Sequence, residues 1–504
     1  MAFLRLPSEL TQAQQGVIAV SLFFLALWFL RPRKYSASRL PGPRPLPFLG
    51  NVFDLNRHAP WTTFTQWKYQ YGDVVGWRAL GNNILVLNSA KAISDLLDKR
   101  GTNNSHRPIF TVSMPIMPYG PEWRHTRKLA HQALGPSAVM KYHGLQEDMA
   151  ALLANEILDN PEEFFDYVRM AAGRIVLAVT YGISVKTADS EYITQADATM
   201  KMISESTVPG AYLCDLIPSM KYLPLWLPFQ KKAVAGKRMI ADFVARPFMK
   251  VKADMDLGVA RPSLTQDLLA NIDSNDEVSH AEYEQLVMWT TGSMYGAGGE
   301  TTYSTVLNFI AAMALNPSTQ SRAQAELDAV IGTDRMPTIA DRGDLPYVNA
   351  VIKETMRWNP VLPLSIARRS EKADVYEGYI IPENTIIMPN SWSLAFEPNP
   401  KYPPAQFMPE RFLDPDHPTV DPSTWAFGFG RRICPGKQLG ENSVFIFITA
   451  LLASLNFSEP SEGKLVQEFD NHLIRYPKPY KCIIRPRSTD RAELVRRRAA
   501  QRDI

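Results

Sequence analysis

Apolar residues recur at helical spacing along most of the chain. One predicted helix follows Pro317 and stops before Gly332, and its apolar positions are Ala323, Leu327, Val330 and Ile331. A second pattern begins near Lys437, with apolar residues at Leu439, Val444, Phe445, Phe447, Ile448, Leu451, Leu452 and Leu455. These patterns predict a mainly helical chain.

Short apolar runs predict a few strands between the helices. Residues 84–87 read as a strand, and residues 379–381 and 386–388 read as a strand and hairpin around the turn signal Pro382-Glu383-Asn384. The last residues, 491–504, are highly charged and predict a frayed or surface helix.

The N-terminal region has the pattern of a membrane anchor. An apolar run from Gly16 to Leu30 is followed at once by Arg31-Pro32-Arg33-Lys34. A cleaved signal peptide is the alternative, but it would carry its positive charge before the apolar run. The positive-inside rule then predicts that everything after Lys34 lies in the cytosol. Four prolines between residues 40 and 50 predict an extended hinge.

Composition narrows the class of protein. The chain has 504 residues, 45% of them hydrophobic and 21% charged, so it can bury a large core. A net charge of +3 does not indicate nucleic-acid binding. The three cysteines are far apart, which predicts neither a disulfide framework nor a zinc site. Sequons at Asn103 and Asn456 are interpreted as unused, because such short motifs arise by chance.

Four glycines interrupt the long helical pattern from Ala281 to Leu315. They lie at 292, 296, 298 and 299, and each costs about 1 kcal/mol relative to alanine inside a helix. One interpretation is close packing between helices. The other is a local opening of the helix where a ligand meets the backbone.

Residues 427–436, Phe-Gly-Phe-Gly-Arg-Arg-Ile-Cys-Pro-Gly, hold the most informative cysteine. A helix N-terminus follows, and Arg431 and Arg432 add positive charge, so Cys434 is predicted to be a thiolate and a metal ligand. Gly430 and Gly436 would allow the backbone to approach a flat cofactor. Taken alone, Cys434 is equally well explained as a small buried hydrophobic residue.

The whole decapeptide resembles the heme-ligand signature of the cytochrome P450 family, Phe-x-x-Gly-x-Arg-x-Cys-x-Gly. This resemblance implies that Cys434 is the axial thiolate of heme b (iron-protoporphyrin IX), a ligand that favours O–O cleavage. Residues 297–302, Ala-Gly-Gly-Glu-Thr-Thr, resemble the oxygen-binding motif of the same family. By resemblance Thr301 hydrogen-bonds bound oxygen and Glu300 helps to relay protons, whereas Thr302 could simply bond to its own helix.

Two further sets of residues match the family. Glu354 and Arg357 form its Glu-x-x-Arg motif, and Arg411 lies in Pro-Glu-Arg-Phe, so the three are implied to be structural residues that hold the Cys434 loop. An ordinary surface ion pair is the alternative for the first two. A second set is implied to bind the heme propionates, namely Trp123, Arg127, Arg368 and Arg432.

The resemblance implies the P450 fold, mainly α with small antiparallel β-sheets. It divides the chain into an anchor (1–34), a hinge (35–50), a heme-thiolate catalytic domain (51–487) and a charged tail (488–504). The expected function is monooxygenation of a lipophilic metabolite by O2, with electrons from NADPH through cytochrome P450 reductase at the endoplasmic reticulum membrane. The chain as a whole resembles fungal secondary-metabolism P450 enzymes of the O-methylsterigmatocystin oxidoreductase type.

Family positions also imply a substrate pocket, lined by Ile109, Met117, Met288, Tyr295, Val361, Leu362, Leu364, Leu473 and Ile474. Two other functions remain open. A P450 isomerase or dehydratase would usually alter the oxygen motif, which is intact in this chain, and a heme-thiolate sensor would bind heme without turnover.

Overall fold

The computed structural model describes residues 38–47, 49–56, 58–108, 112–207, 212, 214, 218–271 and 279–501. The predicted anchor and the pocket residue Ile109 therefore lie outside the described residues. Residues 38–40 belong to one compact unit with residues 374–381, and the remainder of the described residues forms a second, much larger unit.

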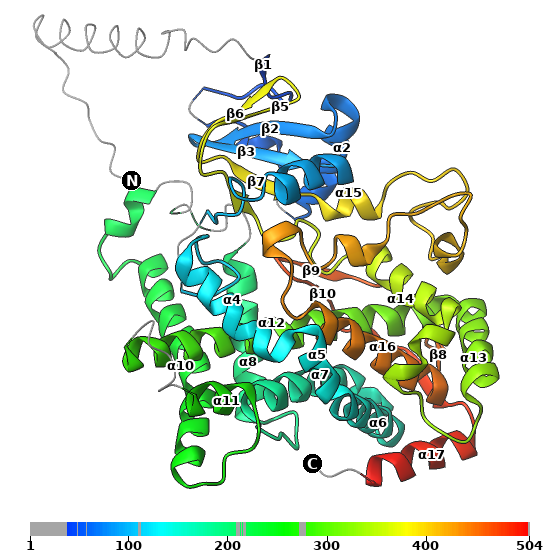
Figure 1. Ribbon diagram of the computed structural model, residues 1–504. Helices are drawn as coiled ribbons and strands as arrows, with labels where there is room; N and C mark the ends of the chain where they lie inside the picture. Colours follow the sequence, from blue (N-terminus) through cyan, green and yellow to red (C-terminus); the bar gives the residue numbers. More distant parts are fainter. Residues whose placement is uncertain are drawn as a thin grey trace, which may run out of the picture. The chain divides into compact units, whose positions relative to one another are not determined.

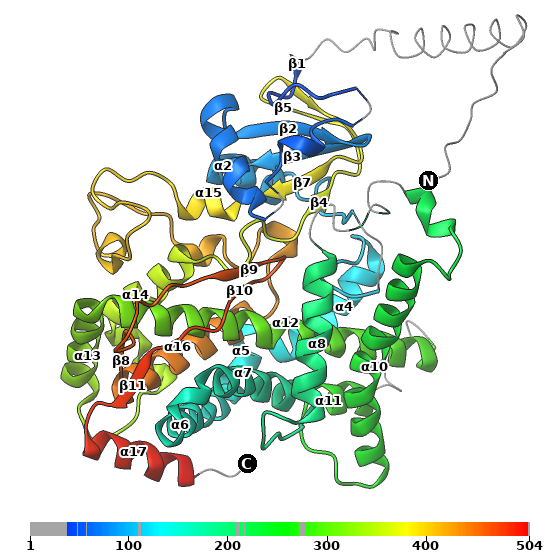
Figure 2. The same ribbon diagram turned by 180° about the vertical axis from the view of Figure 1, so that it is seen from behind.

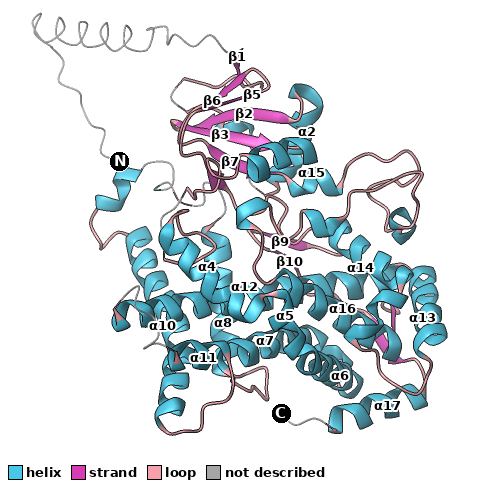
Figure 3. Ribbon diagram, viewed as in Figure 1, coloured by secondary structure: helices cyan, strands magenta, loops and turns pink. Residues whose placement is uncertain are grey.

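The large unit is mainly helical, as predicted (Figure 3). Its labelled helices are α2 (Pro60–Tyr71), α3 (Ala90–Ile93), α4 (Pro121–Leu134), α5 (Pro136–Val139), α6 (His143–Asp159), α7 (Phe164–Tyr181), α8 (Glu191–Ser206), α10 (Pro228–Asp256), α11 (Leu264–Ala270), α12 (His280–Leu315), α13 (Pro317–Ile331), α14 (Pro346–Trp358), α15 (Ser391–Ala395), α16 (Lys437–Ser454) and α17 (Thr489–Ala500).

Helix α12 forms the centre of this unit (Figure 1). It begins with a capping box in which Ser279 and Glu282 bond reciprocally to each other's backbone N–H groups. Helices α4, α7, α8, α10, α14 and α16 all pack against it. The residues of α12 from Val306 to Ala314 are buried, which explains why its sequence is apolar on every side near its C-terminus.

The glycines of α12 are explained by helix packing. A Cβ at Gly292 would lie 2.7 Å from the Val244 side chain of α10, and one at Gly298 would lie 2.7 Å from Val176 of α7. Gly299 faces Gly173 of α7. The helix is continuous from His280 to Leu315, so the predicted local opening is not present.

Among its described residues, the large unit contains three small sheets. Strands β2 (Val74–Ala79), β3 (Asn82–Leu87), β7 (Ile386–Pro389) and β4 (Arg368–Arg369) form one sheet in that order, in which β3 and β7 are parallel. Two antiparallel pairs follow, β8 (Leu455–Ser458) with β11 (Ile483–Pro486), and β9 (Phe469–Asn471) with β10 (Arg475–Pro477), seen most clearly in Figure 2.

The small unit holds β1 (Ser38–Arg39), β5 (Asp374–Tyr376) and β6 (Tyr379–Ile381). The strands predicted at 379–381 and 386–388 are present, but the predicted hairpin between them is wrong. β6 pairs with β1 and β5, and β7 pairs with β3 and β4, because the turn at residues 382–385 carries the chain from one sheet to another.

Helix boundaries agree closely with the sequence pattern. α13 ends before Gly332, as predicted, whereas Leu455 belongs to β8 and not to the helix from Lys437. The charged C-terminal residues form α17, which packs on α6 through buried Leu494 and Val495. None of the helices that the structure describes is both long enough and apolar enough to span a membrane.

Candidate active site

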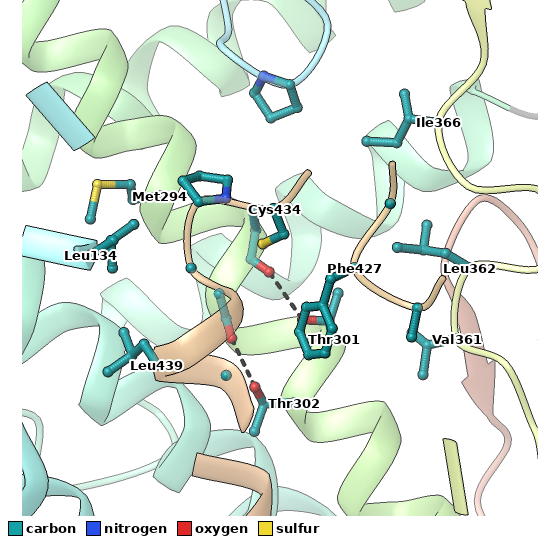
Figure 4. Close-up of a pocket in the computed structure, with 18 of the residues that line it drawn as sticks. Leu134, Met294, Thr301, Thr302, Val361, Leu362, Ile366, Phe427, Cys434 and Leu439 are labelled. Atoms are coloured by element: carbon teal, nitrogen blue, oxygen red, sulfur yellow. Dashed lines mark hydrogen bonds between the residues drawn. The ribbon is translucent and has the colours of Figure 1, made fainter. Parts of the chain in front are cut away.

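A cavity of about 290 Å³ lies beside the middle of α12 (Figure 4). Its wall is mostly apolar and combines residues of α4, α7, α12 and α16 with the loop at 425–436. Thr301, Phe427 and Cys434 face this space together, with Leu134, Met294 and Leu439 on one side of them and Val361, Leu362 and Ile366 on the other. None of the described residues in the wall carries a carboxylate.

The loop around Cys434 is fixed by its own backbone. The N–H of Cys434 donates to the Phe427 carbonyl at 2.8 Å, and the N–H of Gly440 donates to the Gly436 carbonyl as α16 begins. Gly430 has a φ of +49°, and a Cβ there would lie 2.2 Å from the Leu97 carbonyl oxygen. Gly430 therefore allows a close approach to the π-helical turn Ser94–Lys99.

The thiol of Cys434 faces the cavity while protein surrounds it on its other sides. Burial raises its pKa, and the Gly436 N–H and the Arg127 guanidinium oppose this shift. Arg431 and Arg432 were predicted to stabilise the thiolate of Cys434, but their guanidinium groups donate hydrogen bonds to other residues. Arg431 donates to the Tyr119 hydroxyl, and Arg432 donates to the carbonyls of Ser105, Met114 and Met117.

Four arginines, here called the cavity arginines, line the same space: Arg107, Arg127, Arg368 and Arg432. Burial and the repulsion from Arg368 and Arg127 lower the pKa of Arg432 to about 9, and burial lowers that of Arg368 to about 10. Nη1 of Arg368 is buried without a hydrogen-bond partner among the described residues. Asp98 is the one described carboxylate that raises the pKa of any of the four.

This charge pattern fits a cofactor that brings its own anions. Several buried cations with almost no counterion are unfavourable unless a ligand supplies negative charge. The two propionates of heme would supply it, and the sulfur of Cys434 lies in the same cavity. Sequence reasoning missed Arg107, because no motif marks it and only the folded chain brings it into the cavity wall.

The predicted propionate residues from α4 form one cluster with the Cys434 loop. The Arg127 guanidinium lies 5.7 Å from the centre of the Trp123 ring, and the Arg432 guanidinium lies 4.5 Å from that ring. Arg127 also donates to the Ile433 carbonyl at 2.5 Å. These contacts stack cations on an aromatic face and join α4 to the loop.

Thr301 and Glu300, for which the oxygen motif implies roles in catalysis, lie on different faces of α12. Thr301 lines the cavity, and its hydroxyl donates to the Ala297 carbonyl at 3.3 Å. Thr302 also lines the cavity and donates to Gly298 (Figure 4). Glu300 is buried outside the cavity wall, and burial raises its pKa while Arg169 opposes the shift.

Glu354, Arg357 and Arg411 meet in one fully buried cluster. Arg357 donates to both carboxylate oxygens of Glu354 at 2.6 and 2.9 Å, and Arg411 donates to it at 3.1 Å. Both arginines also donate to backbone carbonyls between residues 395 and 406. The cluster thus fixes the chain upstream of the Cys434 loop.

The remaining predicted pocket residues divide into two groups. Leu364 and Leu473 line a second cavity of about 120 Å³, which shares Arg107, Ser365 and Ile366 with the first. Among the residues described, four line neither cavity: Met117, Met288, Tyr295 and Ile474. Tyr295 instead stacks on Phe243, and its hydroxyl donates to the Tyr192 carbonyl.

Comparison with known proteins identifies the family. Residues 40–484 match the family model of cytochrome P450. The chain belongs to the cytochrome P450 family. It is 36% identical to the cytochrome P450 monooxygenase COX2 of Coprinopsis cinerea, over 91% of this chain and 90% of the relative. It is 34% identical to the tryptamine 4-monooxygenase of Psilocybe cyanescens, over 94% of this chain and 98% of that enzyme.

These similarities make the protein a P450 monooxygenase of the fungal secondary-metabolism type, as the sequence predicted. P450 enzymes contain heme iron and use O2, a redox partner and a small-molecule substrate. Across the described part of the chain, no group of three or more histidine, cysteine or acidic side chains could hold a further metal ion.

Proposed function

We propose that Cys434 ligates heme iron and that the cavity arginines bind the heme propionates. The observation that carries this proposal is the placement of one cysteine sulfur and four poorly compensated guanidinium groups around a single apolar cavity. When bound, heme supplies the oxygen-activating chemistry of the family. The protein supplies the axial ligand, the anion-binding groups and a mostly apolar wall.

We propose a lipophilic secondary metabolite as the substrate, oxidised with electrons from NADPH through cytochrome P450 reductase. The wall of the cavity supports this class, since it is apolar apart from the arginines and a few hydroxyl groups such as Ser293, Thr301 and Ser365. Among the residues that the structure describes, none in the wall carries a carboxylate that could pair with an amine. Incubation of candidate terpenoids, polyketides and indole derivatives with the enzyme, reductase and 18O2 would identify the product by mass spectrometry.

We propose that Thr301 guides protons to bound oxygen, because its hydroxyl lies in the wall that Cys434 shares. In Thr301→Ala, NADPH consumption should continue while product falls and hydrogen peroxide rises. Loss of positioned acid–base assistance costs about 10²–10⁴-fold. Thr291→Ala is the matched control, because Thr291 is a buried threonine of the same helix outside the cavity wall. An unchanged ratio of product to NADPH in Thr301→Ala would contradict this role.

We also propose a single N-terminal anchor in the endoplasmic reticulum membrane, with the catalytic domain in the cytosol. Residues 31–34 support this orientation through the positive-inside rule. The amides of both sequons are engaged, since Asn103 pairs with the Lys372 backbone and Asn456 accepts from Gln324. Microsomal protein should show no mobility change after endoglycosidase treatment, and a change would contradict the topology.

A further inference from the structure

Three amide side chains, here called the amide ring, lie at the start of the segment that carries Val361 and Leu362 into the cavity wall. Nδ2 of Asn359, at the end of α14, donates to Oε1 of Gln467 at 3.0 Å, and Nε2 of Gln467 donates to Oδ1 of Asn308 at 2.8 Å. Nδ2 of Asn308, on α12, donates back to the Asn359 carbonyl at 3.3 Å and closes the ring. Asn308 and Asn359 are buried, so their amide groups depend on these partners for hydrogen bonds.

Arg475 of β10 supplies the donor at the open end of the amide ring. Its Nη1 donates to Oδ1 of Asn359 at 3.0 Å, and a guanidinium group can only donate. At the other end, the Asn359 carbonyl can only accept. Donors and acceptors therefore follow one order from Arg475 through Asn359 and Gln467 to Asn308, and each amide in that order has its partner.

The guanidinium group of Arg475 is held between aromatic rings. Its Cζ lies 3.6 Å from the centre of the Phe469 ring and 5.0 Å from the centre of the Trp392 ring. Its Nε donates to Oδ1 of Asn471 at 3.4 Å. Burial lowers the pKa of Arg475 to about 10, and no carboxylate of the described residues opposes this shift. The partners of this cation are thus amides and rings, and not an acidic side chain.

The backbone of Arg475 contacts the cavity wall directly. Its N–H donates to the Val361 carbonyl at 2.9 Å, and the hydroxyl of Ser304 on α12 donates to its carbonyl at 2.9 Å. Val361 and Leu362 face the cavity (Figure 4). The side chain and the backbone of Arg475 therefore hold the same short segment, residues 359–361.

We propose that Arg475 is a positioning residue that sets, through Asn359, where Val361 and Leu362 stand in the cavity and hence which ligands fit beside them. The inference rests on the proposed function, in which the substrate lies in this cavity at the heme. Without the Arg475 side chain, Oδ1 of the buried Asn359 loses its donor, and an unsatisfied buried amide is unfavourable. Asn359 then rotates toward another partner, and the wall that follows it in the chain moves.

The test compares two azoles that bind heme iron and shift its absorption band. Imidazole is small and needs no contact with Val361 or Leu362, whereas 1-phenylimidazole extends into the cavity. In the heme-loaded enzyme, Arg475→Met should weaken the binding of 1-phenylimidazole about tenfold, the size of one charge-assisted hydrogen bond, and leave that of imidazole unchanged. Gln467 is half-buried, so Gln467→Met should show the same selectivity if Arg475→Met folds poorly.

Two controls separate positioning from a general loss of stability. Arg475→Lys keeps a side chain that can only donate and should restore most of the affinity for 1-phenylimidazole. Arg487→Met removes an arginine that donates to Asp328 and to the Ala453 carbonyl outside the cavity wall, so it should leave the affinities for both azoles unchanged.

A double-mutant cycle with Val361→Ala tests whether Arg475 acts through the wall. The losses of binding free energy for 1-phenylimidazole should be less than additive when Arg475→Met and Val361→Ala are combined. Additive losses, an equal loss for both azoles, or an unchanged affinity for 1-phenylimidazole would overturn the proposal. Failure of the proposed function is distinct, because the parent enzyme itself would then shift no heme band with either azole.

Discussion

Two sets of arginines in this protein both donate to backbone carbonyls, but only one set shares a buried carboxylate. Arg357 and Arg411 share the carboxylate of Glu354 and donate their remaining N–H groups to nearby carbonyls. Arg107, Arg368 and Arg432 are comparably buried, whereas Arg127 is half-buried. Asp98 is the one described carboxylate that raises the pKa of any of the four, and burial together with repulsion within the set lowers the pKa of Arg107 and Arg432.

The difference separates structure from ligand binding. A buried charge with a partner in the chain stabilises one arrangement of the backbone. Removing the partner leaves the other charge buried and uncompensated, which strongly lowers the free energy of unfolding. Buried cations without a paired carboxylate are complementary to a ligand of opposite sign. The first set therefore fixes the chain between residues 395 and 408, and we infer that the second set is completed by the carboxylates of heme.

The largest change in unfolding free energy is expected when Arg357 and Arg411 lose the carboxylate of Glu354. Glu354→Gln leaves two buried guanidinium groups without a counterion, which costs about 3–5 kcal/mol of unfolding free energy. Urea unfolding of the heme-loaded enzyme would measure this. The exposed pair of Glu410 with Arg322 supplies the control, because Glu410→Gln should cost less than about 1 kcal/mol. Equal losses of unfolding free energy in Glu354→Gln and Glu410→Gln would show that the buried cluster stabilises the chain no more than an exposed ion pair does.

Substitution of a cavity arginine is expected to change heme retention rather than the unfolding free energy. Arg368→Gln should leave the unfolding free energy of the chain nearly unchanged while heme is lost faster. A charge-assisted hydrogen bond contributes about 1.5–3 kcal/mol, or roughly a ten- to hundredfold change in retention. Heme transfer to an acceptor protein would measure the rate. Arg431→Gln is the control, since Arg431 is exposed and donates to Tyr119. An unchanged rate of heme loss in Arg368→Gln would contradict the inference that the cavity arginines bind the carboxylates of heme.

The smallest effect should come from Asp98, the one described carboxylate that raises the pKa of a cavity arginine. Asp98→Asn removes a charge that raises the pKa of Arg368, so the cavity becomes slightly more positive. Asp98 is exposed, and solvent screening limits the change in heme retention to less than about fivefold. The same heme-transfer assay should show slower loss, and faster loss would indicate that Asp98 serves mainly to position Arg368.

The sequence predicted the parts of this protein that depend on local pattern. The helices around residues 281–315, 317–331 and 437–454 follow from apolar spacing, and the loop of Cys434 follows from its motif. The strand partners of residues 379–381 and 386–388 did not follow, because pairing depends on segments far away in the chain. Arg107 lies outside any motif, and only the folded chain brings it to the cavity.

The heme-thiolate assignment is tested most directly by the absorption spectrum of the reduced protein with carbon monoxide. The parent should show the band of thiolate-ligated heme, and Cys434→Ser should abolish it. Cys214→Ser and Cys482→Ser should keep the band, since neither cysteine lines the cavity and burial raises the pKa of Cys482 to about 12. A thiolate band that persists in Cys434→Ser would contradict the account.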